Sequence, residues 1–212
     1  MSTATAPRGV FITLEGPDGS GKSSQAKLLA DYLRGKNLDI LLTREPGGTA
    51  ISDQIRSVLT NLENTSMDGR TEFLLFSASR AQHVREVIQP HLENGGVVVS
   101  DRFFDSSIAY QGYGQKLELA MLREITLFAT GGLVPDLTLL LDLPCDVGLD
   151  RRKNDGSWNR LDAYDLEFHS RVRDGYLELA AEEPSRWVIV DALASPEVVQ
   201  NQIRHAVDER LP

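Results

Sequence analysis

The sequence predicts an α/β fold, with one domain over residues 1–212, a parallel sheet and helices on both faces of that sheet. Two observations predict it. Short apolar runs alternate with longer amphipathic segments along the whole chain, and no internal repeat, linker or low-complexity tract interrupts the alternation. Strands that alternate with helices are joined by right-handed crossovers, which make neighbouring strands parallel and cover both faces of the sheet.

Five apolar runs are expected to be buried strands, because each is compact, rich in Val, Ile and Leu, and bounded by Gly, Pro or charge. In chain order they cover residues 10–15, 40–43, 97–101, 137–143 and 187–191. The first helix begins after Lys22 and ends near Gly35. Its apolar face has helical spacing and consists of Ala26, Leu29, Ala30 and Leu33. Further helices are expected over residues 71–88 (stopped around Pro90), 117–129, 163–182 and 196–209.

Composition excludes several classes of partner. The chain has 22 basic and 31 acidic residues and a formal net charge of −9, whereas proteins that coat nucleic acid are usually basic. Its only cysteine, Cys145, suits a reducing compartment. No apolar run approaches the roughly 18 residues of a membrane helix, and the first eight residues lack the apolar stretch of a secretory signal. We therefore expect a cytoplasmic protein with no membrane or nucleic-acid partner.

Residues 16–23 form a phosphate-binding motif. They fit the pattern G-x-x-x-x-G-K-[ST] and lie between the first strand and the first helix, the context that such a loop requires. Glycines let backbone N–H groups curl around a phosphate, and the helix N-terminus adds a partial positive charge. Lys22 is expected to reach the β- and γ-phosphates of a nucleoside triphosphate. The candidate nucleotide-binding residues are Gly16, Pro17, Asp18, Gly19, Ser20, Gly21, Lys22 and Ser23.

A magnesium site is expected beside this loop. The Ser23 hydroxyl can ligate the ion, and a carboxylate from a neighbouring strand can help to hold it. Asp101 follows three valines at the end of the run 97–101. Its carboxylate is therefore expected to face the loop, with capping of the following turn as the alternative. Arg102 follows immediately, too near the strand end to be a remote surface arginine.

Residues 150–160 break the alternation of strand and helix, since they are polar, carry four basic residues and have little core-forming material. They form either a solvated loop or a mobile lid that brings cations over a ligand. Nine basic residues lie in segments expected to face the phosphate-binding loop, and an acidic protein that gathers cations at one cleft is organised to bind polyanions. They are Lys22, Arg44, Arg56, Arg80, Arg102, Arg151, Arg152, Lys153 and Arg160.

Three classes of phosphate-loop protein compete. A GTPase switch would carry an Asn-Lys-x-Asp motif, which the sequence lacks. A motor or transport ATPase usually acts within a larger assembly. A small kinase needs a second anionic pocket with its own arginines and a lid, and the distribution of basic residues favours this class.

The expected helix over residues 71–88 carries a stripe in which Phe73, Phe76 and Arg80 lie three or four residues apart. Phe73 is expected in the core. Phe76 with Arg80 has two interpretations: core packing, or a site where the ring stacks on a base while the guanidinium hydrogen-bonds its edge or a phosphate.

Two longer motifs make a family resemblance specific. Residues 44–49 (Arg-Glu-Pro-Gly-Gly-Thr) and 101–111 (Asp-Arg-Phe-x-x-Ser-Ser-x-Ala-Tyr-Gln) resemble the signature segments of thymidylate kinases. The phosphate loop, the Phe76 and Arg80 pair and residues 159–162 (Asn-Arg-Leu-Asp) complete the set in family order. The resemblance implies a P-loop NTPase fold with a five-stranded parallel sheet and a short basic lid. It also implies transfer of the γ-phosphoryl group of ATP to dTMP with Mg²⁺, giving dTDP and ADP for dTTP synthesis.

The resemblance also implies roles in recognising the acceptor nucleoside. Phe76 would stack on thymine and Arg80 would hydrogen-bond the base. Ser107 and Gln111 would contact its polar edge. Tyr110 would pack against the deoxyribose where a 2′-hydroxyl would sit, which disfavours ribonucleotides.

The residues expected around the phosphates carry mostly positive charge. By resemblance, Arg56 and Arg102 would hold the dTMP phosphate, with Arg102 between acceptor and donor. Glu45 would contact the sugar or the magnesium shell. Lys22 and Arg102 are expected to act in catalysis, because phosphoryl transfer is promoted mostly by alignment and cations. Asp18 is a further candidate near the phosphates or the sugar 3′-hydroxyl.

Family members carry one catalytic arginine either in the phosphate loop or in the lid. The loop here contains none, so the resemblance assigns that role to Arg151, Arg152 or Arg160. The family is typically homodimeric. The alternatives that remain are a kinase for another nucleoside monophosphate or for a deoxynucleoside, and a nucleotide-binding module without catalysis.

Overall fold

The computed structural model describes residues 8–154, 156 and 158–210. The start of the chain, where the sequence predicts no secretory signal, and two positions of the expected lid, Asp155 and Ser157, lie outside these residues. No helix in the described part is long and apolar enough to cross a membrane.

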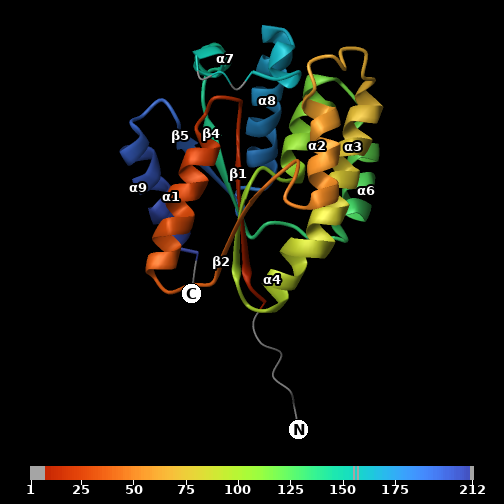
Figure 1. Cartoon of the computed structure of the whole chain (residues 1–212). Coiled ribbons are helices and arrows are strands. Elements are labelled where there is room, and N and C mark those ends of the chain that lie inside the picture. The colour runs from red at the N-terminus through yellow and green to blue at the C-terminus, as the bar shows by residue number, and fades with distance from the viewer. Residues whose placement is uncertain (1–7, 155, 157, 211–212) are drawn as a thin grey trace.

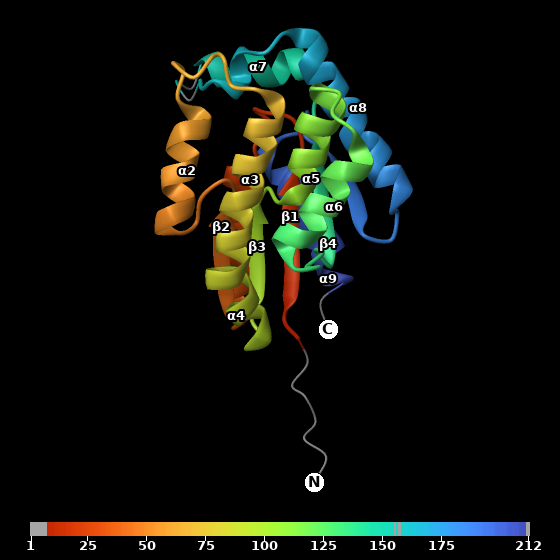
Figure 2. The same ribbon diagram turned by 90° about the vertical axis from the view of Figure 1, so that its right-hand side faces the viewer.

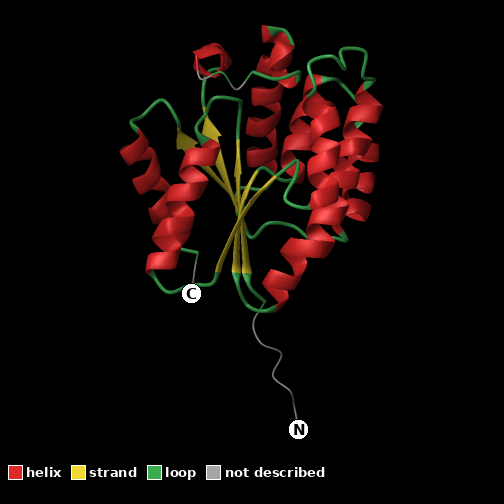
Figure 3. Cartoon of the chain, viewed as in Figure 1, coloured by secondary structure: helices red, strands yellow, loops and turns green. Residues whose placement is uncertain are grey.

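The predicted parallel sheet is confirmed. Its five strands are all parallel, in the order β2-β3-β1-β4-β5. Figure 3 shows the strands in yellow between two layers of helices. The strands are β1 (Val10–Glu15), β2 (Ile40–Arg44), β3 (Val97–Asp101), β4 (Leu137–Asp142) and β5 (Trp187–Asp191). Leu14 of β1 and Arg44 of β2 both lie beside Asp101 of β3. The carboxyl ends of these three strands therefore meet at one edge of the sheet, where open α/β sheets bind ligands.

Helices cover both faces, as expected. Figure 1 shows α1 and α9 on one face, and α3, α4, α6 and α8 on the other, with α2 packed beside α3. The α-helices are α1 (Lys22–Gly35), α2 (Ala50–Thr60), α3 (Gly69–His83), α4 (Gln89–Glu93), α5 (Phe104–Ser107), α6 (Leu119–Thr130), α7 (Cys145–Asn154), α8 (Leu166–Glu182) and α9 (Pro196–Asp208). Two π-helical turns, η1 (Val84–Ile88) and η2 (Ile108–Gly114), and one 3₁₀ turn, η3 (Leu161–Ala163), complete the chain.

The apolar core has a layer on each side of the central strands. On one side, Leu14 and Leu139 pack with Leu29 of α1 and Ile203 of α9. On the other side, Leu140 of β4 belongs to a cluster formed largely by η2 and α8. Burial of both strand faces explains why the central strands read as continuous apolar runs rather than as alternating patterns.

Three expectations about helices need correction. The helix expected over residues 71–88 is α3 followed by η1, and the chain stays helical through Pro90, which lies in α4 just after the π-helical turn, where the backbone hydrogen-bond register changes. The helix expected over residues 163–182 begins at Leu166, because the Asp165 carboxylate caps it by accepting from the Phe168 N–H at 2.7 Å. Residues 150–154 are not loop but the last turn of α7.

Candidate active site

The phosphate-binding loop follows β1 directly and is shaped by close backbone contacts. Gly16 and Gly19 have φ angles of 135° and 75°, in the region that L side chains rarely adopt. A Cβ on Gly16 would collide with the Leu141 carbonyl oxygen, and one on Gly19 with the carbonyl oxygen of Gly148 in α7. The glycines of the motif thus allow the loop to pack against both β4 and α7.

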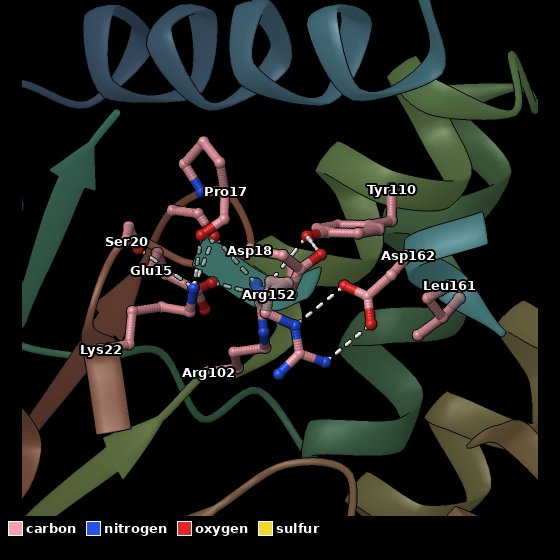
Figure 4. Close-up of polar contacts among 12 residues, drawn as sticks. Glu15, Pro17, Asp18, Ser20, Lys22, Arg102, Tyr110, Arg152, Leu161 and Asp162 are labelled. Atoms are coloured by element: carbon pink, nitrogen blue, oxygen red, sulfur yellow. Dashed lines mark hydrogen bonds and ion pairs between the residues drawn. The ribbon is translucent and has the colours of Figure 1, made fainter. Parts of the chain in front are cut away.

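Lys22 lies inside the curl of the loop at the start of α1 (Figure 4). Its ammonium group donates to the carbonyl oxygens of Gly16 at 3.0 Å and Pro17 at 2.7 Å and to Ser20 Oγ at 3.2 Å. Burial, followed by the nearby Arg102 charge, lowers the pKa of Lys22 to about 8. An anion bound in the loop would favour the protonated form of this lysine.

Ser23 and Asp101 meet at the mouth of the loop, as expected for a magnesium site. The Ser23 hydroxyl donates to Asp101 Oδ2, which the strand register brings opposite the start of α1. A hydroxyl and one carboxylate are hard oxygen ligands, and Mg²⁺ is usually held by one or two carboxylates with substrate phosphates and water. The described residues contain no group of three or more His, Cys, Asp or Glu that could hold a metal. The donor set therefore fits a magnesium ion that arrives with a nucleotide.

The loop opens into a cleft of about 730 Å³ that runs from the phosphate loop to α3 and is covered by the end of α7. Most of the residues that the sequence assigns to the site line it. They are Asp18, Gly19, Gly21, Lys22, Ser23, Glu45, Arg56, Phe76, Asp101, Arg102, Ser107, Tyr110, Gln111, Arg151 and Arg152. Of the remaining candidates, Gly16, Pro17 and Ser20 belong to the loop itself, and Arg80 and Arg160 are buried behind the cleft wall.

Arg102 lies at the centre of this cleft, with an unusual backbone φ of 73°. Its guanidinium donates to Asp18 Oδ1 at 2.6 Å, to the Tyr110 hydroxyl at 3.2 Å and to the Tyr176 hydroxyl at 2.9 Å. Burial alone would raise the pKa of Asp18, but the Arg102 and Lys22 charges outweigh burial and hold that pKa well below its usual range. Asp18 is therefore an anion that anchors Arg102 between the two ends of the cleft.

Arg80 is 1% exposed and lies behind the cleft wall, one turn along α3 from Phe76. Its guanidinium donates to Glu45 Oε2 at 2.8 Å and to Ser107 Oγ at 3.1 Å. Arg80 Nη1 is buried and has no hydrogen-bond partner among the described residues. Phe76 is half-buried and lines the cleft, whereas Phe73 is in the core as expected.

Six of the nine basic residues expected to face the phosphate loop line the cleft, whereas Arg80 and Arg160 are buried behind its wall and Lys153 is exposed outside it. Arg56 donates to the Pro46 carbonyl oxygen at 2.8 Å, and burial together with neighbouring Arg44 lowers its pKa. Both arginines line the cleft. Crowded like charges of this kind are relieved by a bound anion.

The three candidates for the catalytic arginine of the lid do not lie together. Arg151 donates to the Gly19 carbonyl oxygen at 3.3 Å, above the phosphate loop. Arg152 forms a bidentate pair with Asp162, at 3.0 and 2.7 Å (Figure 4). Arg160 turns away from the cleft and pairs with Glu72 of α3. Among the three, only Arg151 and Arg152 line the cleft.

Four residues of this region were missed by the sequence reasoning. Glu15 and Ser106 lay within recognised segments, but nothing marked a buried carboxylate at the end of β1 or distinguished this serine from its neighbour. Tyr176 lies on α8, outside any motif, and Glu72 lies on α3 one turn before Phe76, with no signal of its own to mark it. Only the fold brings them next to Arg102 and Gln111.

Comparison with known proteins agrees with this geometry. Residues 14–203 match the family model described as thymidylate kinase. The chain belongs to the thymidylate kinase family. Among curated members, the thymidylate kinase of Roseiflexus sp. (strain RS-1) is 50% identical over 214 residues, covering 95% of each chain. That of Carboxydothermus hydrogenoformans is 49% identical, covering 93% of this chain and 96% of its own.

A solved structure agrees as well. The crystal structure of thymidylate kinase from Ehrlichia chaffeensis superposes with a TM-score of 0.78 at 33% identity, covering 95% of this chain and 99% of that one. The five-stranded parallel sheet of the P-loop NTPase fold is thus common to both. Family membership makes this thymidylate kinase homologue a kinase whose substrates are small molecules.

Proposed function

We propose that the chain phosphorylates dTMP to dTDP with ATP and Mg²⁺, as a single nucleoside monophosphate kinase domain of the cytoplasm that contributes to dTTP synthesis. The observation that carries the proposal is one cleft with two different ends. One end is the phosphate loop with Lys22 and Ser23, and the other is a pocket lined by Phe76, with Arg80 buried behind its wall. Arg102 lies between them and is held by Asp18.

The second end suits a nucleoside monophosphate. Phe76 offers a ring face on which a base can stack, and Arg80 Nη1 is a buried donor free to bond a carbonyl oxygen of the base. Tyr110 lies beside Asp18 and Arg102, where the sugar would connect base and phosphate. Arg56 and Arg102 carry the positive charge that the 5′-phosphate requires.

The transfer step needs alignment and cations rather than a strong base, because the attacking oxygen of the dTMP phosphate is already anionic. That oxygen forms a bond to the γ-phosphorus of ATP while the bond to the β–γ bridging oxygen breaks, and ADP leaves with that electron pair. Lys22, Arg102 and the arginines of α7 stabilise the charge that spreads over the transferring oxygens. Ser23 and Asp101 would hold a magnesium ion, which when bound would supply positive charge to offset that of the nucleotide phosphates.

The acceptor range tests the proposal directly. ADP release is followed with ATP and magnesium while dTMP, dUMP, UMP, AMP and thymidine are offered separately. Turnover with dTMP well above that with UMP, AMP and thymidine is the expected result. Preference for another acceptor would refute the assignment of the pocket, and no turnover with any of the five would leave a nucleotide-binding module.

We also propose that the protein is a homodimer. Helices α3 and α6 lie side by side on the outer layer (Figure 2). They carry four exposed large apolar side chains, Leu74, Met121, Leu127 and Phe128, which we call the apolar patch. Phe128 is 89% exposed. Large apolar side chains clustered on one face are typical of protein–protein interfaces.

A further inference from the structure

Glu72 is a fully buried carboxylate at the back of the proposed base pocket. Its Oε1 accepts from Gln111 Nε2 at 2.7 Å and from Gln115 Nε2 at 2.6 Å. Its Oε2 accepts from Arg160 Nη2 and from the Tyr164 hydroxyl at 3.2 Å. A carboxylate has about four lone-pair sites, so every one of them is used by these four donors.

This arrangement determines which way the Gln111 amide faces. An ionised carboxylate can only accept hydrogen bonds, so the NH₂ group of Gln111 must lie on the Glu72 side. The carbonyl oxygen Oε1 is then the atom turned away from Glu72. That oxygen is buried and has no hydrogen-bond partner in the part of the chain that the structure describes. Since Gln111 lines the cleft, its unpartnered atom is an acceptor that suits an N–H of the ligand.

We propose that Glu72 is a positioning residue for base selection: it holds Gln111 with the carbonyl oxygen available to the acceptor base, and so favours a base with an imino N–H. The proposal rests on the function proposed above. Thymine and uracil carry N–H at N3, whereas cytosine has a lone pair there that would meet the Gln111 oxygen unfavourably. A site built to hydrogen-bond a substrate N–H rejects analogues without it far more strongly than apolar contacts could.

Arg160 has a supporting part in this arrangement. Besides pairing with Glu72, it donates to the Leu59 carbonyl oxygen at the end of α2 at 2.9 Å and to the Tyr164 hydroxyl at 3.2 Å. It is buried and does not line the cleft. The positive charge that compensates Glu72 thus comes from the segment that follows α7, and Arg160 acts on base binding rather than on phosphoryl transfer.

The substitution Glu72→Gln tests the proposal, because glutamine is the same size and can both donate and accept. With it, the Gln111 amide is free to turn over. The ratio of kcat/KM for dTMP to that for dCMP is expected to fall at least about tenfold, through a higher KM for dTMP and a gain with dCMP. Part of the preference for dTMP is expected to remain in this variant, because Arg80 can only donate hydrogen bonds and still favours a base with a carbonyl oxygen at position 4. The KM for ATP is expected to stay within about twofold, since Glu72 has no contact with the donor site.

Tyr164→Phe is the matched control, because it removes one hydrogen bond from Oε2 and leaves Oε1 to hold Gln111. Its dTMP-to-dCMP ratio is expected to stay within about threefold of the parent ratio. An equal loss of kcat/KM for both nucleotides in Glu72→Gln would show a purely structural role and overturn the proposal. An unchanged ratio would overturn it as well.

Equilibrium binding of dTMP and dCMP, measured by calorimetry on the same proteins, separates this proposal from the proposed function. If the parent chain forms no dTDP, the proposed function fails, while the binding ratio still decides the role of Glu72. If the parent chain is active and neither ratio changes in the variant, only the inference fails. Should Glu72→Gln not fold, as judged by circular dichroism, Glu72→Asp withdraws the carboxylate from Gln111 but keeps its charge, and the same fall in ratio is expected.

Discussion

Glu15 shows how the fold changes the chemistry of a single residue. It ends β1, is fully buried beneath the phosphate loop, and accepts from the Phe103 N–H at 2.7 Å and from Ser106 Oγ at 2.6 Å. The Tyr176 hydroxyl of α8 donates to it at 3.1 Å. Burial, followed by the nearby Asp105 charge, raises the pKa of Glu15 from 4.5 to about 7. The folded protein therefore favours the protonated form of this carboxyl.

The raised pKa of Glu15 predicts a pH-dependent contribution to stability. Between pH 4.5 and about 7 the folded state holds this proton more tightly than the unfolded chain. The contribution is therefore fully present below pH 4.5 and is lost as pH rises through 7, by an amount on the order of 3 kcal/mol. Glu15→Gln cannot titrate and does not share this loss, while the two neighbouring hydroxyls can rotate to accept from its amide.

Urea unfolding of both proteins at pH 5, 6, 7 and 8 measures the effect. The free energy of unfolding of Glu15→Gln, relative to that of the parent, is expected to rise with pH by up to about 3 kcal/mol. Other titrating groups are common to both proteins and cancel in the difference. Two parallel stability curves would contradict the raised pKa.

At the scale of elements, α7 decides which lid arginines can act on the phosphates. It places Arg151 above Gly19 of the phosphate loop and Arg152 at the cleft wall, paired with Asp162. Arg151→Ala and Arg152→Ala are each expected to lower kcat, and the larger of the two losses should reach about 10³-fold, the scale of an arginine that stabilises transferring phosphoryl charge. Steady-state kinetics with ATP and dTMP measure this loss.

Lys153→Ala is the control on the same helix, since Lys153 is exposed, pairs with Asp150 and does not line the cleft. Its kcat is expected to stay within about twofold of the parent value, because an exposed pair of this kind contributes little. If both arginine variants keep near-normal kcat, α7 merely covers the cleft.

The strands and the phosphate loop could be predicted from sequence because their signals are local. An apolar run bounded by Gly, Pro or charge specifies a buried strand, and the loop motif lies where β1 meets α1. The helix α7 could not be predicted in this way. Only Cys145 and Gly148 are buried along it, so it has no apolar stripe. It packs through Gly148, whose backbone touches Asp18 and Gly19 of the phosphate loop.

The start of helix α2 is marked in the sequence, although no helix was predicted there. Thr49 caps it by accepting from the Ser52 N–H at 3.1 Å, and an N-cap threonine after two glycines is a recognisable start. The proposed base pocket could be predicted only in part. Phe76 and Gln111 could be found from motifs. Glu72 acts on Gln111 across two helical segments, so its role depends on a tertiary contact that the sequence does not reveal.

For the whole molecule, the distribution of charge separates the cleft from the rest of the surface. The chain has a formal net charge of −9, yet Lys22, Arg44, Arg56, Arg102, Arg151 and Arg152 line one cleft. A local concentration of cations attracts an anionic ligand. This pattern fits the binding of two small phosphorylated substrates.

The apolar patch on α3 and α6 predicts the oligomeric state of the whole molecule. A dimer is expected by light scattering at micromolar concentration, and Phe128→Asp should convert it to a monomer, because a charge would then be buried without a partner at the interface. Leu193→Asp is the control: Leu193 is also exposed, but it lies in the loop between β5 and α9, away from the patch. That variant is expected to remain dimeric. A monomeric parent protein would contradict the proposed dimer. A Phe128→Asp variant that keeps twice the chain mass would show that the subunit contact lies elsewhere.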